Sequence, residues 1–241
     1  MSKFTRKSSV LVTSLVFALL CTSLAFGKKA SAGAYELFGE AQLVSPGNAS
    51  PTAAQLRSDN DPGYGGIDLG IPTGITFADL EKLSTDFNLT EGDCGGGSPR
   101  FQINVLIPNT TTVKNIFVYL GTPPNYNLCT PGWQSSGDLL ETGKTVDTSQ
   151  LGGNFYDPYD SAVAAYGSYE VVGLQLVTDA GWSQVGGVQT SLVDNIMVNN
   201  TLFSFESADT CKNGGWQQFY AAPGPFKNQG QCVSYFAKGG R

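Results

Sequence analysis

Histidine is absent from all 241 residues. This absence excludes nucleophiles activated by histidine, metal sites with histidine ligands and general base catalysis by imidazole. Carboxylate chemistry, a lysine or tyrosine base, or no catalysis at all are what remain. Basic residues are also scarce, with 14 Lys and Arg against 20 Asp and Glu.

The N-terminus has the pattern of a secretion signal. Lys3, Arg6 and Lys7 precede an apolar stretch over residues 10–26, and Ala30-Ser31-Ala32 forms a small-x-small cleavage site. The alternative is a membrane anchor, but the apolar stretch is short and hydroxyl side chains interrupt it. We therefore predict a signal peptide over residues 1–32 and a secreted or extracytoplasmic protein with no membrane span after cleavage.

Cleavage would sharpen the charge imbalance. Nine Lys and Arg would remain against 20 Asp and Glu, a formal charge of −11. Such a surface repels nucleic acid and anionic lipid. We therefore expect no nucleic-acid partner.

Four cysteines remain after cleavage: Cys94, Cys129, Cys211 and Cys232. An even number in an exported chain indicates two disulfides, with three connectivities open. We favour Cys94 with Cys129 and Cys211 with Cys232, because each pair closes a moderate loop in its own part of the chain. A zinc site with four thiolates is the alternative, but it would require Cys-x-x-Cys spacing, which the sequence lacks.

Short strands between glycine- and proline-rich turns dominate the rest. Residues 101–107 and 115–120 predict a hairpin, and residues 168–179 predict a long strand in which Gly173 indicates a bulge or a close approach of another backbone. Further strands are expected over residues 34–44, 66–69, 194–199 and 201–206. Only residues 77–83 and 160–166 look helical, and residues 77–83 could equally be a segment that connects two strands. The pattern predicts an all-β antiparallel β-sandwich, jelly-roll-like, over residues 33–207, and a small disulfide-stapled appendix over 208–241.

Two groups of residues carry a family resemblance. The tail motifs Cys-Lys-Asn-Gly-Gly-Trp (211–216) and Lys-Asn-Gln-Gly-Gln-Cys (227–232) resemble a C-terminal cassette of uncharacterised exported bacterial proteins. Residues 94–101 and 193–199 resemble secreted proteins with a galactose-binding or carbohydrate-binding-module jelly roll. This resemblance implies the fold and export. It also implies a structural calcium ion between the first and last strands, held by Glu36 and Asp194.

Three residues are candidates for ligand binding. Trp133 and Trp182 each follow a glycine and precede polar residues, so they could stack on sugar rings or plug the ends of the core. Arg100 enters a strand, where it could bind a carboxylate of a ligand or a neighbouring aspartate. Trp216 lies inside the second disulfide loop, where a small core needs a large apolar residue.

The sequence favours a secreted, non-enzymatic β-sandwich protein that binds glycans or cell-envelope polymers. A carbohydrate-active hydrolase is the first alternative, because glycoside hydrolysis needs two carboxylates and no histidine. A structural surface or adhesion component is the second. No carboxylate pair is singled out by the sequence.

Overall fold

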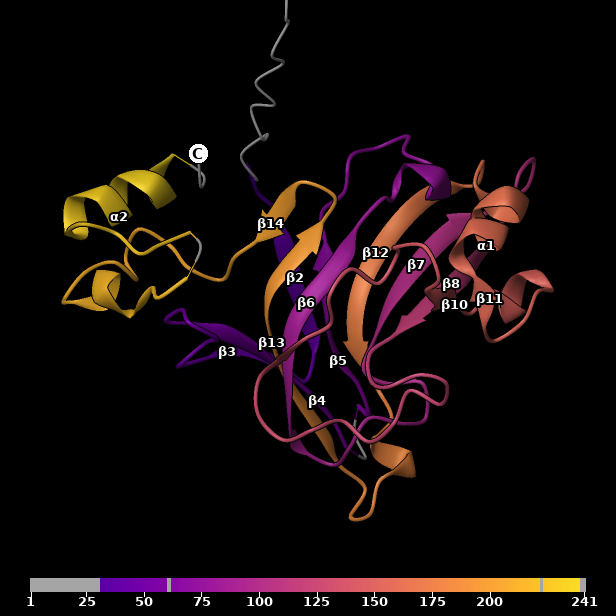
Figure 1. The fold of residues 1–241 in the computed structure, drawn as a ribbon, viewed down its shortest axis with the longest axis horizontal. Coiled ribbons are helices and arrows are strands. Elements are labelled where there is room, and N and C mark those ends of the chain that lie inside the picture. Colours follow the sequence, from indigo (N-terminus) through magenta and orange to yellow (C-terminus); the bar gives the residue numbers. More distant parts are fainter. Residues whose placement is uncertain (1–30, 60–61, 222, 239–241) are drawn as a thin grey trace, which may run out of the picture.

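The computed structural model describes residues 31–59, 62–221 and 223–238. It shows two β-sheets packed face to face and a small C-terminal appendix that lies to one side of them (Figure 1). The predicted antiparallel sandwich with a stapled appendix is confirmed. The predicted signal peptide lies outside the described residues, except for the two residues of β1.

The seven-stranded sheet is organised around one long strand. Its strands are β1 (Ser31–Ala32), β14 (Thr201–Phe203), β13 (Gln189–Val198), β4 (Ala53–Ser58), β3 (Ala41–Val44), β6 (Leu83–Glu91) and β9 (Gln134–Ser135). Strand β13 pairs with β6 on one side and with β4 and β14 on the other. All these pairings of β13 are antiparallel, as expected for a sandwich built from hairpins and crossovers.

The five-stranded sheet has the order β2 (Tyr35–Gly39), β5 (Gly65–Leu69), β12 (Glu170–Thr178), β7 (Arg100–Leu106) and β8 (Val113–Tyr119). The predicted hairpin is the β7–β8 pair. A bulge, one of the two expectations for Gly173, is also present, because the register of β12 against β7 shifts between Val171 and Gly173. Every pairing in this sheet is antiparallel.

Alternation along the strands builds the core between the two sheets. In β7, Phe101, Ile103 and Val105 are fully buried, while the residues between them face the other side of the sheet. Side chains of the seven-stranded sheet such as Leu56 and Val193 meet them in one continuous core. Each such side chain stabilises the fold by about 1.5–3 kcal/mol.

The predicted strand over residues 34–44 is instead two strands in different sheets. Gly39 turns the chain with φ +60°, and a Cβ at this position would lie 2.3 Å from the carbonyl oxygen of Tyr64. Only glycine fits this turn without strain. The turn therefore transfers the chain from β2 in one sheet to β3 in the other.

Helices are short, and one of them differs from the prediction. The segment predicted over residues 77–83 contains only the 3₁₀ helix η1 (Phe77–Asp79), because Leu83 already belongs to β6 and is buried in the core. The second prediction corresponds to α1 (Tyr159–Tyr166), close to β10 (Thr145–Val146) and β11 (Asp157–Pro158). Two further 3₁₀ helices are η2 (Ser149–Leu151) and η3 (Gly181–Ser183).

The appendix contains an α-helix that was not predicted from the sequence. Its two helical elements are η4 (Gly215–Gln218) and α2 (Gln229–Ala237), and Asn228 caps α2 by accepting a hydrogen bond from the N–H of Gln231. The Cys211–Cys232 disulfide lies in a separate small core with Phe219 and Phe226, and Trp216 packs against that core as expected. In the part of the chain that the structure describes, no helix is long and apolar enough to cross a membrane.

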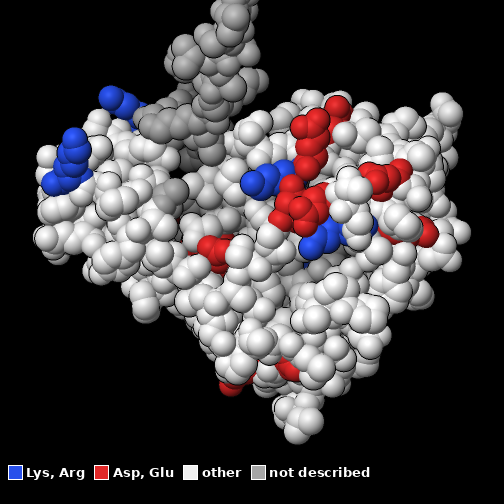
Figure 2. Space-filling view, viewed as in Figure 1, with Lys and Arg blue, Asp and Glu red and all other residues white. Residues whose placement is uncertain are grey.

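Charge is divided unequally between the two parts of the chain. Residues 33–207 carry five Lys and Arg against nineteen Asp and Glu, a net −14, whereas residues 208–241 carry four against one. Figure 2 shows the acidic side chains of the viewed face over the sandwich and basic side chains on the appendix. The sandwich is therefore the acidic part of the protein.

Candidate functional site

The three predicted ligand-binding residues lie on separate elements. Trp133 is half-buried and directly precedes β9 at the edge of the seven-stranded sheet. Trp182 lies on η3 and is 77% exposed, so it does not plug the core. Arg100 begins β7, and its Nη1 and Nη2 each donate to one oxygen of Asp179 at 2.6 Å. The internal salt bridge, one of the two expectations for Arg100, is therefore present.

The predicted calcium ligands belong to different sheets. Glu36 is exposed on β2, while Asp194 is buried on β13 and accepts hydrogen bonds from the N–H of Asn48 and the hydroxyl of Ser50. Neither belongs to the one group of three potential ligating side chains that the described residues form, Asp93, Cys94 and Cys129. Calcium binding by Glu36 and Asp194 stays a prediction, and this placement gives it no support.

Asp194 gives a prediction about pH. Burial raises the pKa of this carboxyl to about 7, and the nearby charge of Glu206 adds to the rise against the hydrogen bonds that lower it. The folded protein therefore binds this proton more tightly than the unfolded chain, and stability falls as pH rises from 4 to 7. We expect the unfolding free energy to decrease between pH 5 and pH 7, by up to about 1.4 kcal/mol per pH unit from this group.

Urea unfolding at a series of pH values measures this slope. No histidine titrates between pH 5 and pH 7, because the chain contains none. The Asp194→Asn variant removes the titrating group, so its stability should vary less across the same pH range. An equal slope in both proteins would contradict the assignment to Asp194.

A second surface, formed by strands of the five-stranded sheet, was not predicted. Along each of these strands, every second side chain points into the core, and the side chains between them point away from the sandwich. In register across the sheet, Glu36 faces Asp68, Asp68 faces Gln175, and Gln175 faces Gln102, which in turn faces Phe117. We call this surface the outer face and define it by these side chains: Glu36, Asp68, Arg100, Gln102, Asn104, Phe117, Tyr119, Gln175 and Asp179.

Hydrogen bonds connect the polar side chains of the outer face. The amide of Gln102 donates to Gln175 at 3.0 Å, and the amide of Gln175 donates to Asp68 at 2.6 Å. Two polar atoms of this face, the Nε of Arg100 and the Oδ1 of Asn104, are buried without a hydrogen-bond partner. An unpartnered buried polar atom costs about 1–3 kcal/mol and is uncommon in folded proteins.

Aromatic rings line one edge of the outer face. Phe117 and Tyr119 on β8 stack with centroids 6.3 Å apart, Tyr119 lies 5.6 Å from Tyr126, and Tyr126 lies 5.8 Å from Tyr156. We call these four rings the aromatic strip. At its far end is a cleft of about 300 Å³. The cleft is lined by Gly96, Gly97, Tyr119, Asn125, Tyr126, Phe155 and Tyr156.

One ring of the aromatic strip and one ring beside it are accessible from solvent. Tyr156 is 48% exposed, and its neighbour Phe155 in the cleft is 62% exposed. The hydroxyl of Tyr119 donates to Asp147, and burial, together with this hydrogen bond, raises the pKa of the tyrosine. Tyr119 therefore stays neutral and fixed, while Tyr156 presents its ring.

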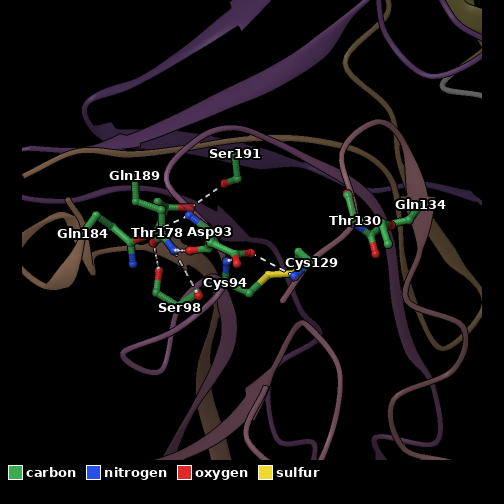
Figure 3. The surroundings of a disulfide bond; sticks show 10 residues. All are labelled: Asp93, Cys94, Ser98, Cys129, Thr130, Gln134, Thr178, Gln184, Gln189 and Ser191. Carbon is green, nitrogen blue, oxygen red and sulfur yellow. Dashed lines mark hydrogen bonds between the residues drawn. A yellow bond between two sulfur atoms is a disulfide. The ribbon is translucent and has the colours of Figure 1, made fainter. Parts of the chain in front are cut away.

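The Cys94–Cys129 disulfide fixes two loops of the cleft. It joins the loop of Gly96 and Gly97 to the loop of Tyr126, as paired in the prediction. Figure 3 shows the carboxylate of Asp93 beside it, where Oδ1 accepts the backbone N–H groups of both cysteines at 2.7 and 2.8 Å. The sulfurs are bonded to each other, so they are not thiolates available to a metal.

Hydrogen bonds connect Asp93, beside the disulfide, to the outer face. Gln189 is fully buried and donates to the carbonyl oxygen of Asp93 at 2.6 Å, while its own oxygen accepts the hydroxyl of Ser98. The hydroxyl oxygen of Ser98 accepts the N–H of Asp179 at 2.9 Å. The disulfide loops and the Arg100–Asp179 pair are therefore held in one hydrogen-bonded unit.

Sequence patterns contained part of this site. The alternation in residues 101–107 already placed Gln102 and Asn104 on the face of the strand that points away from the core. Polar residues on that face normally just contact water, so they did not indicate a binding site. Tyr126 and Tyr156 lie in irregular segments with no periodicity, so their approach to Tyr119 had no sequence signal.

The sequence matches no protein-family model and no curated protein. Among solved structures, the fold is similar to that of an exo-beta-agarase, at 12% identity and a TM-score of 0.34. The similarity covers 70% of this chain and 24% of that chain. The chain thus spans about a quarter of the length of the protein it resembles.

Proposed function

We propose that the protein binds glycans along the outer face, with the aromatic strip as the stacking edge. The observation that carries this proposal is the aromatic strip beside the hydrogen-bonded amides of Gln102 and Gln175. Sugar rings stack their C–H faces on aromatic planes, while amide and carboxylate groups bind the hydroxyls.

The compartment proposed is outside the cytoplasm. Two disulfides, Cys94–Cys129 and Cys211–Cys232, support it, because disulfides persist in oxidising environments. The signal peptide predicted over residues 1–32 supports it from the sequence side. We propose a secreted, non-enzymatic binding protein whose partner is a polysaccharide or an envelope glycan.

Titration of the protein with a panel of polysaccharides tests the site. Tyr126→Ala and Tyr156→Ala should each weaken binding about five- to tenfold, because a stacked aromatic contributes about 1–1.5 kcal/mol. Isothermal titration calorimetry gives the dissociation constants. The control is Tyr220→Ala, which removes a tyrosine that is 75% exposed on the appendix and should leave affinity unchanged.

The same titrations test the residues predicted from sequence. Trp133 and Trp182 stay predicted ligand-binding residues, and their alanine variants should leave affinity unchanged if the outer face is the site. A large loss with Trp182→Ala and none with Tyr156→Ala would move the site to η3. Binding to no polysaccharide in a broad panel would contradict the proposal.

Hydrolysis is the second candidate, favoured by one observation. Glu36 and Asp68 are both exposed and lie directly opposite each other on β2 and β5. Opposed residues of antiparallel strands have Cβ atoms about 4.5–5.5 Å apart, so their carboxyl groups are within reach of the separation of about 5–5.5 Å that retaining glycosidases need. Release of reducing ends from a polysaccharide, abolished by both Glu36→Gln and Asp68→Asn, would identify the protein as a hydrolase.

A further inference from the structure

We propose that the glycan bound on the outer face is uncharged. This inference rests on the proposed function and adds the chemical class of the ligand. The residues that decide it are the one cation of the outer face, Arg100, and the two carboxylates at its other end, Glu36 and Asp68.

Arg100 has no pair of donors left for a ligand. Its Nη1 donates to the carbonyl oxygen of Gly97 at 3.0 Å and to Asp179 at 2.6 Å, and its Nη2 donates to Asp179 at 2.6 Å and Gln102 at 3.4 Å. Strong, bidentate binding of a carboxylate or sulfate uses two parallel N–H groups of the guanidinium fork. Only the Nε–H remains, and this atom is buried, so the guanidinium offers no accessible donor to an anionic ligand.

Packing also fixes the guanidinium in this orientation. The Cζ of Arg100 lies 4.7 Å from the centroid of the Phe117 ring, and its side chain is only 13% exposed. Rotating the group toward an anionic ligand would break the pair with Asp179 and the contact with Phe117. The positive charge of the outer face is therefore neutralised internally.

The opposite end of the outer face is negative. Glu36 and Asp68 are exposed and in register on neighbouring strands, and the described contacts of Asp68 include the amide of Gln175. A ligand carboxylate or sulfate placed here would meet two like charges. Because the whole sandwich carries −14, a polyanion would also be repelled before contact.

The remaining polar groups suit neutral hydroxyls. The amides of Gln102 and Gln175 each carry both a donor group and an acceptor group, as a sugar hydroxyl does. Uncharged ring faces stack on the aromatic strip without desolvating an ionic group. Neutral polysaccharide is thus the class that the outer face matches in both charge and hydrogen bonding.

Matched polysaccharide pairs that differ only in charge provide the test. Dextran with dextran sulfate, and hydroxyethylcellulose with carboxymethylcellulose, are run in affinity gels and calorimetry at low and high salt. We expect the neutral member of a recognised pair to bind at least about tenfold more tightly at low salt, with a difference that shrinks as salt screens the repulsion.

Two outcomes overturn the inference in distinguishable ways. Tighter binding of the anionic member, weakened by salt, would overturn the neutral-ligand inference and leave glycan binding standing. Binding to neither member of any pair would overturn the proposed function together with the inference.

A charge-reversal variant assigns the preference to the outer face. Glu36→Lys removes the repulsion at one end and should reduce the neutral preference at low salt about threefold or more. The control is Glu81→Lys, which makes the same change in net charge at an exposed position outside the outer face. An equal reduction in both variants would show that net charge alone decides, and would overturn the assignment to the outer face.

Discussion

A chain with Cys94 and Cys129 both replaced by serine is expected to be about 4 kcal/mol less stable than the unaltered chain. The disulfide spans 35 residues, including the whole β7–β8 hairpin, so its removal greatly increases the conformational freedom of the unfolded chain. The variant should also lose most of its glycan affinity, because the loops of Gly97 and Tyr126 are no longer tied together. Urea unfolding and calorimetric titration measure the two effects.

The second disulfide is the matched control. Replacing Cys211 and Cys232 by serine removes a bond that spans 21 residues and holds only the small core of the appendix. The loss of stability should be comparable, about 3 kcal/mol, but it concerns the appendix, and glycan affinity should be unchanged. Equal loss of binding in both double variants would contradict the role assigned to the first disulfide.

Features specified by local sequence were predictable. The β7–β8 hairpin follows from alternation in two neighbouring runs with a polar turn between them, and the bulge at Gly173 follows from a glycine inside a strand pattern. The disulfide pairing also followed from spacing, because loops closed within one region need no knowledge of the tertiary structure.

Features that depend on tertiary packing were not predictable. The division of residues 34–44 into β2 and β3 requires the close approach of Gly39 to Tyr64, which are 25 positions apart. The appendix helix α2 is nine residues long and would be marginal in isolation, so its stability comes from packing around the disulfide of Cys232.

The outer face also depends on tertiary packing, so the candidate site could not be predicted from the sequence. Gln102 and Gln175 lie 73 positions apart in the sequence, and only the β7–β12 register brings their amides to 3.0 Å. Tryptophans were the predicted sugar-stacking residues, and no tyrosine was among them. The aromatic strip depends on β8 and two irregular loops meeting at one edge, which no periodicity encodes.

Replacing Asp179 by alanine should destabilise the protein by about 2–3 kcal/mol, because it leaves the guanidinium of Arg100 with no counter-charge. The side chains of Arg100 and Asp179 are 13% and 29% exposed, so water replaces the lost bonds only in part. Urea unfolding at neutral pH measures the loss. Adding Arg100→Met to this variant should recover much of the stability, since methionine retains the contact with Phe117 and removes the unpaired charge.

An exposed ion pair of the same length separates burial from simple charge loss. Lys212 and Asp209 are also 2.6 Å apart, but their side chains are 55% and 82% exposed, so Asp209→Ala should produce no measurable change. Equal effects of Asp179→Ala and Asp209→Ala would contradict the buried role of Arg100. That result would also undermine the neutral-ligand inference, because an Arg100 that exchanges its partner freely could bind an anionic glycan.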